Sequence, residues 1–163
     1  MIRPAAIALA CCVGACTPPR HAADAVVQGA AARELFFTRE HARQLVLWAD
    51  PDEPGPTFDV IGERKARVDA AAVATAIPAP VIPVRAADLA RLFRSHPDGW
   101  AAFYFAYPGA PGLVELARPI WSGDTLATVI VGRACGEHCF NAWRVTVRDG
   151  HVVTTVPLHI PKS

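Results

Sequence analysis

The chain lacks the short motifs that identify common enzyme active sites. There is no Gly-x-Ser-x-Gly, Gly-x-Gly-x-x-Gly, P-loop or His-Glu-x-x-His pattern. Serine is scarce, and none of Ser95, Ser122 and Ser163 stands in a nucleophile motif. The six histidines are scattered along the chain. The sequence therefore gives no catalytic residue and no cofactor, and it favours a non-enzymatic protein over an enzyme.

An excess of charge of one sign is also missing. The 163 residues carry 16 basic and 15 acidic side chains, a balance that argues against a nucleic-acid partner. The apolar run at residues 5–13 is far shorter than the ~20 residues that a membrane-spanning helix requires. Hydrophobic residues make up 52% of the chain, which is enough for the core of one domain.

The N-terminus has the layout of a bacterial secretory signal. Arg3 precedes the apolar run, and the sequence Val-Gly-Ala-Cys at residues 13–16 resembles the lipobox at which lipoproteins are cleaved and acylated. Residues 1–15 are therefore predicted to be a signal peptide, and Cys16 the site that receives palmitate-like acyl chains. The mature chain would keep 148 residues and be held on a membrane through this lipid anchor.

Two other cysteines near Cys16 offer alternative cleavage points. Cys12 is preceded by Cys11, where the motif prefers a small residue, and Cys11 leaves almost no apolar run ahead of it. Cys16 fits better than either. Thr17 follows it rather than aspartate, which by the sorting rule of Gram-negative bacteria resembles a lipoprotein of the outer membrane. The expected location is the cell envelope, at the periplasmic face of the outer membrane.

Residues 16–23 are predicted to be the lipidated cysteine and its tether, followed by a single α+β domain over residues 24–163. Apolar positions recur every four residues from Asp24 to about Phe37, as in a helix. A short apolar run at 44–49 indicates a buried strand, and 50–56 a loop. The pattern at 57–84 is weak, although the prolines at its end predict an extended connector.

Two helices and a set of strands are predicted in the second half. Leu89, Leu92 and Phe93 give one amphipathic helix, and Asp98 can cap a second. The second helix carries an aromatic row that favours a core position over a sugar-binding or peptide-binding platform. The members of that row are Trp100, Phe103, Tyr104 and Tyr107.

The C-terminal part is predicted to form antiparallel sheet. Strand-like segments occupy residues 113–116, 126–131, 143–148 and 152–156, and Pro157 is expected to end the last. Asp-Gly at 149–150 predicts a tight hairpin turn. The expected fold is α+β, with short helices packed on an antiparallel β-sheet that ends in hairpins.

Cys135 and Cys139 are the one group of residues whose spacing suggests a disulfide, a redox site or a metal site. They stand between two predicted strands, at the tip of a hairpin, and an oxidising compartment favours a structural disulfide between them. A thioredoxin-like redox role is disfavoured because three residues intervene and no helix follows. The remaining alternative is a metal site made by Cys135, His138 and Cys139, with His151 or His159 as a fourth ligand.

The second half also resembles a group of uncharacterised exported bacterial lipoproteins. The shared pattern is Trp-x-x-Phe-Tyr-x-x-Tyr-Pro-Gly at 100–109, then Leu-x-Arg-Pro at 116–119, Cys-Gly-x-x-Cys at 135–139 and Asp-Gly at 149–150. This resemblance implies a fold and a location in the cell envelope, but it implies no enzymatic activity.

These observations predict a lipid-anchored envelope protein that serves as a non-enzymatic binding or interaction module. Its expected partner is an envelope protein or peptidoglycan. The alternative is a small envelope enzyme or metal-binding protein that uses Cys135, His138 and Cys139.

Overall fold

In a computed structural model of the chain, the described residues are 20–63 and 68–160. Cys16, its rivals Cys11 and Cys12, and the predicted signal peptide lie outside these ranges. The first helix, α1 (Arg20–Ala32), continues into a π-helical turn, η1 (Arg33–Thr38). The helix thus begins earlier than its apolar spacing predicts. Within residues 20–63 and 68–160, no helix has the length and hydropathy of a membrane span.

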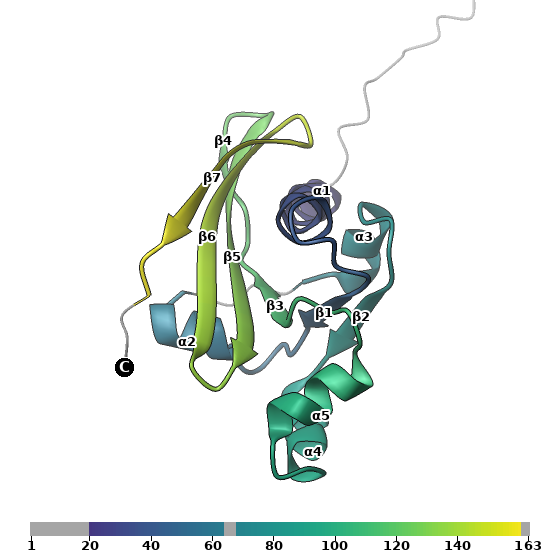
Figure 1. The fold of residues 1–163 in the computed structure, drawn as a ribbon. Helices are drawn as coiled ribbons and strands as arrows, with labels where there is room; N and C mark the ends of the chain where they lie inside the picture. Colours follow the sequence, from purple (N-terminus) through teal and green to yellow (C-terminus); the bar gives the residue numbers. More distant parts are fainter. Residues whose placement is uncertain (1–19, 64–67, 161–163) are drawn as a thin grey trace, which may run out of the picture.

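A seven-stranded sheet forms the centre of the molecule, and the predicted α+β class is confirmed (Figure 1). The strand order is β2-β1-β3-β5-β6-β7, and β4 pairs with β5 outside this path. The sheet is mostly antiparallel, but β1 pairs in parallel with both β2 and β3, which the sequence did not predict. The strands are β1 (Leu45–Trp48), β2 (Val81–Val84), β3 (Leu113–Leu116), β4 (Ile120–Ser122), β5 (Leu126–Gly136), β6 (Cys139–Arg148) and β7 (His151–Leu158).

Helices cover both faces of the sheet. One face packs against α1, η1 and α3 (Ala70–Thr75), and its core includes Val114 and Leu116 of β3. The alternate position Leu113 points to the other face, where it packs with α4 (Ala86–Arg94) and α5 (Gly99–Ala106). Helix α2 (Pro56–Ile61) contacts β5 and β6 on that second face, where the ring of Phe58 lies against Gly132.

Several local predictions are confirmed at the level of single residues. The Asp98 carboxylate accepts hydrogen bonds from the backbone N–H groups of Trp100 and Ala101, and so caps α5. Asp149 and Gly150 have φ values of 49° and 76°, as a type I′ turn requires. The last strand runs past Pro157 to Leu158, beyond its predicted end. Proline is tolerated there because β7 is an edge strand.

The fold brings three separate segments to one end of the sheet. The tip of the β5–β6 hairpin, α2 and the α4–α5 pair lie toward the same end of the molecule, opposite the turn between β6 and β7 (Figure 1). The candidate site lies among these three segments.

Candidate functional site

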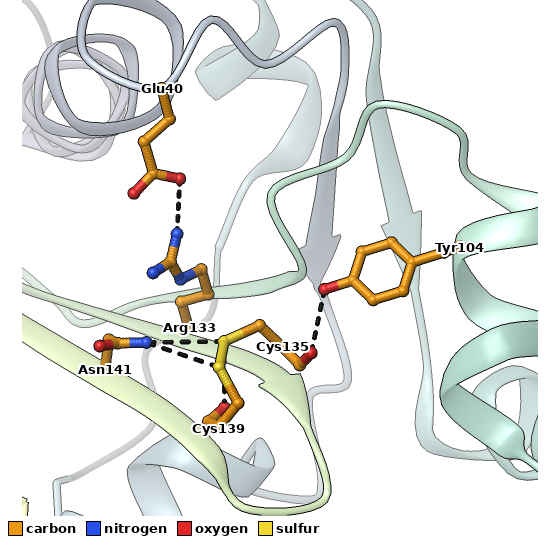
Figure 2. Close-up of a disulfide and its surroundings, with 6 residues drawn as sticks. All are labelled: Glu40, Tyr104, Arg133, Cys135, Cys139 and Asn141. Atoms are coloured by element: carbon orange, nitrogen blue, oxygen red, sulfur yellow. Dashed lines mark hydrogen bonds and ion pairs between the residues drawn. A yellow bond between two sulfur atoms is a disulfide. The ribbon is translucent and has the colours of Figure 1, made fainter.

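A cysteine pair closes the tip of the β5–β6 hairpin. Cys135, near the end of β5, is bonded to Cys139, the first residue of β6, with their Cα atoms 5.0 Å apart (Figure 2). The strand register shifts between Ala134 and Gly136, so the hairpin is irregular at this point. The cysteines therefore meet as the disulfide hypothesis requires, and the bond holds a hairpin tip rather than distant parts of the chain.

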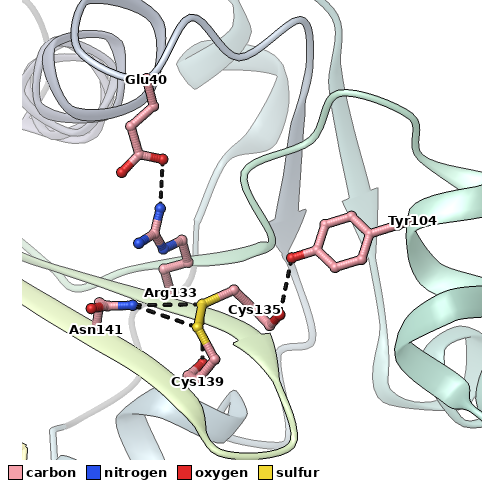
Figure 3. A network of polar contacts seen from close by, with 6 residues as sticks. All are labelled: Glu40, Tyr104, Arg133, Cys135, Cys139 and Asn141. Carbon is pink, nitrogen blue, oxygen red and sulfur yellow. Dashed lines mark hydrogen bonds and ion pairs between the residues drawn. A yellow bond between two sulfur atoms is a disulfide. The ribbon is translucent and has the colours of Figure 1, made fainter.

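Side chains from two other elements fix this tip in place. The Tyr104 hydroxyl, on α5, donates a hydrogen bond to the Cys135 carbonyl oxygen at 3.1 Å (Figure 3). Partial burial raises the pKa of Tyr104 above 10.0, against the opposing effect of Arg133, so the phenol keeps its proton at neutral pH. The Arg133 guanidinium pairs with Glu40 and lies 5.2 Å from the Trp143 ring centre.

The described residues do not form the alternative metal site. Cys135 and Cys139 are bonded to each other, and a disulfide offers no thiolate to a metal. His138 is exposed at the tip, whereas His151 pairs with Arg148 at the far end of β6, roughly 30 Å away at the usual rise per residue. Among the residues that the structure describes, no three His, Cys, Asp or Glu side chains are close enough to hold a metal ion. His159, the other proposed fourth ligand, therefore belongs to no such group.

Beside the disulfide lies an open groove of about 530 Å³. It is bounded by the segment that leads into α2, by the α4–α5 pair and by the hairpin tip. Its walls include Pro54, Pro56 and Gly136. Four large, half-buried apolar side chains also line it and are here called its floor: Leu89, Phe93, Trp100 and Phe140.

The aromatic row of α5 is divided between the core and this groove. Of the predicted row only Phe103 is fully buried; Trp100 and Tyr107 are half-buried, Tyr104 is exposed, and Trp100 lines the groove. The ring centres of Phe93 and Trp100 are 5.3 Å apart. Gly99 makes this contact possible, since a Cβ at that position would lie 2.6 Å from Cγ of Phe93. The groove floor is therefore a packed aromatic surface with one face open to solvent.

The rim of the groove carries negative charge. Glu53, Asp59 and Glu137, here called the rim, are exposed lining residues; the first two belong to the segment that leads into and begins α2, and the third to the hairpin tip. No lysine, arginine or histidine belongs to the lining. Within the part of the chain that the structure describes, none of these three carboxylates has an ion-pair partner. Their charge is thus available to a molecule in the groove.

A buried carboxylate holds the α2 wall of the groove. Glu115, on β3, is only 1% exposed and accepts hydrogen bonds from the backbone N–H groups of Thr57 (2.7 Å) and Phe58 (2.9 Å). It thereby caps a helix distant from it in sequence. Burial raises the pKa of Glu115, and the two backbone hydrogen bonds partly oppose this effect.

Sequence reasoning did not find the groove or its buried acid. One signal was present, because Glu115 interrupts an otherwise apolar strand, Leu113–Leu116. The pattern does not say what such an acid contacts. Glu53, Asp59 and Glu137 gave no signal, since isolated acids in loops are ordinary surface residues.

No protein-family model, curated protein or solved structure matches this chain. The geometry of the groove is therefore the evidence that bears on its function. None of its ten lining residues is a serine, cysteine or histidine. It does offer an apolar surface with unpaired charges around it, which is the composition of a binding site.

Proposed function

We propose that the protein is a lipid-anchored envelope protein that works as a non-enzymatic binding module, with the groove beside Cys135–Cys139 as its binding site. The observation that carries this proposal is the half-buried aromatic floor, in which Phe93 and Trp100 are packed together and still line the open groove. Rigid aromatic side chains in such places supply much of the energy of protein recognition.

The construction of the walls supports the same function. The hairpin wall is held by the disulfide and by the hydrogen bond from Tyr104. The α2 wall is held by Glu115. Walls that are fixed before a partner arrives lose little conformational freedom on binding, and this favours affinity. The site is thus arranged for recognition without a large rearrangement.

The anchoring part of the proposal depends on Cys16 and is tested by Cys16→Ser. A lipoprotein with this change should lose its fatty-acid label and leave the membrane fraction, because the domain would have no acyl chains to hold it. Cys12→Ser is the matched control and should stay labelled and membrane-bound. Unchanged membrane retention of Cys16→Ser would refute the lipoprotein assignment.

The binding part is tested by site-specific photocrosslinking in cells of the native host. A photoreactive residue in place of Glu137 should give a discrete crosslinked product with an envelope protein or with peptidoglycan. The same residue in place of Asp124, at the opposite end of β5, should not. Adding Trp100→Ala to the position-137 protein should abolish the product. Equal labelling from both positions would show that the groove is not the binding site.

A further inference from the structure

We propose that the groove receives a cationic protein segment, one that presents arginine or lysine beside an apolar side chain. This inference rests on the proposed function, because it assumes that the groove is the binding site, and it adds the chemistry of the partner. Two features carry it: the sign and placement of the rim charges, and the nature of the floor.

The rim charges all have the same sign and come from two parts of the fold, the α2 segment and the hairpin tip. Glu53 precedes α2, Asp59 lies in its first turn, and Glu137 is at the hairpin tip. Like charges placed around one groove repel one another and are relieved by a cation. Among the described residues that line the groove none is basic, so a cationic partner would relieve this repulsion. Complementary charge of this kind selects the partner and accelerates encounter.

The floor suits the rest of such a segment. Leu89, Phe93 and Phe140 form an apolar surface on which an aliphatic or aromatic side chain loses contact with water. The Trp100 ring adds a surface that attracts guanidinium and ammonium groups, since its π-face is electronegative. One arginine could therefore pack its stem on the floor while its head group meets a rim carboxylate.

The open shape favours a protein segment over a small cation. Sites for small molecules usually enclose ~70–90% of the ligand surface, whereas this groove is more open than enclosed. A small cation would reach one carboxylate and leave most of the apolar floor exposed to water. An extended segment can cover the floor and meet acids on more than one wall.

The test uses the full-length protein, purified with its lipid anchor in a neutral detergent. Three fluorescent, end-blocked octapeptides serve as probes: alternating arginine and leucine, alternating glutamate and leucine, and alternating arginine and glycine. Binding is followed by fluorescence anisotropy, with protein-free micelles as the blank. The arginine–leucine peptide should bind saturably and more tightly than both others. Its affinity should fall as salt is raised from low to physiological ionic strength.

Substitutions in the groove then test whether the peptide binds there. Glu53→Gln, Asp59→Asn and Glu137→Gln should each weaken binding by about 1.5- to 5-fold, as expected for exposed ion pairs, and the triple variant should weaken it by about ten-fold or more. Asp124→Asn, which removes an exposed charge elsewhere, should leave affinity unchanged. Trp100→Ala should abolish binding. Phe105→Ala is its control on the same helix, because Phe105 is 91% exposed and does not line the groove.

Each other outcome overturns the inference. If the glutamate–leucine peptide binds as tightly, or the triple variant binds normally, the groove is not selective for cations, although crosslinking from position 137 would still support a binding module. If no peptide binds while that crosslink forms, the partner has different chemistry. If tetramethylammonium at millimolar concentration displaces the peptide, the site recognises a small cation. If the protein self-associates through Trp100 instead, a second copy is the occupant.

Discussion

The carboxylate of Glu115 fills the space that a side chain at Gly55 would occupy. A Cβ built on Gly55 overlaps the Glu115 side chain, which is itself held by two backbone N–H groups and could move aside only by breaking these hydrogen bonds. The φ of Gly55 is −75°, so its backbone conformation is open to any residue. Glycine is therefore required at this position for its size and not for its flexibility.

Gly55→Ala should lower the free energy of unfolding by about 1–3 kcal/mol, the usual cost of overpacking a filled interior. Urea denaturation of wild type and variant measures this change. The double variant with Glu115→Ala provides the control, because removing the carboxylate vacates the space that the new methyl group needs. The two changes should then be strongly non-additive. Additive costs would mean that the contact between these residues does not limit position 55.

The stability of the protein should fall as pH rises through the titration of Glu115. Burial raises the pKa of this carboxyl group above its ordinary value of 4.5, so in the window between the unfolded and folded pKa the native state binds more protons than the unfolded state. The free energy of unfolding therefore decreases with pH across that window and levels off above it. Denaturation measured at a series of pH values should show this slope.

Glu115→Gln removes the titrating group and should remove this component of the slope. Glu137→Gln, an exposed carboxyl group, is the matched control and should retain the component. Indistinguishable pH profiles for wild type and Glu115→Gln would contradict the assignment of a raised pKa to this residue.

The double variant Cys135→Ala/Cys139→Ala should still fold, with a loss of about 2 kcal/mol in the free energy of unfolding, because the closed loop is short. The larger consequence should appear in the groove. Gly136 and Phe140, which flank the bonded cysteines, line it and would be held less firmly, so affinity for the arginine–leucine peptide should drop more than with Asp124→Asn. Undiminished affinity would show that the tip needs no covalent support.

His138→Ala should be nearly silent in stability, within about 0.5 kcal/mol, since His138 is exposed. The matched control is His151→Ala, an exposed histidine at the other end of β6. Metal analysis of the purified protein is done in parallel. Stoichiometric zinc that disappears with His138→Ala would replace the disulfide account with a metal site.

Local signals predicted those elements whose determinants are adjacent in the chain. Asp98 caps the helix that begins at the next residue, and Asp149–Gly150 turns the strands on either side of it. The alternating residues of 143–148 lie in β6, with one face buried. In each case the interacting groups are a few residues apart, so spacing alone identifies them.

The elements that were missed depend on distant partners. Helix α2 has no side-chain cap of its own, because its capping carboxylate comes from Glu115 on β3. Strand β2 contains Pro83 and was predicted only as an extended connector, yet it pairs with β1. The groove could not be predicted for the same reason, because its walls come from three segments that only the folded chain brings together.

The parallel pairing of β1 has a consequence for the order in which the chain assembles. Residues of β5, β6 and β7 meet through tight turns, so these contacts close short loops and form early. Strand β1 pairs with β2 and β3, whose residues follow much later in the chain, and so must wait for slower loop closure. During that interval Leu45–Trp48 is an unpaired apolar strand. A chain that is synthesised from its N-terminus therefore presents this apolar segment before the two strands that pair with it are available.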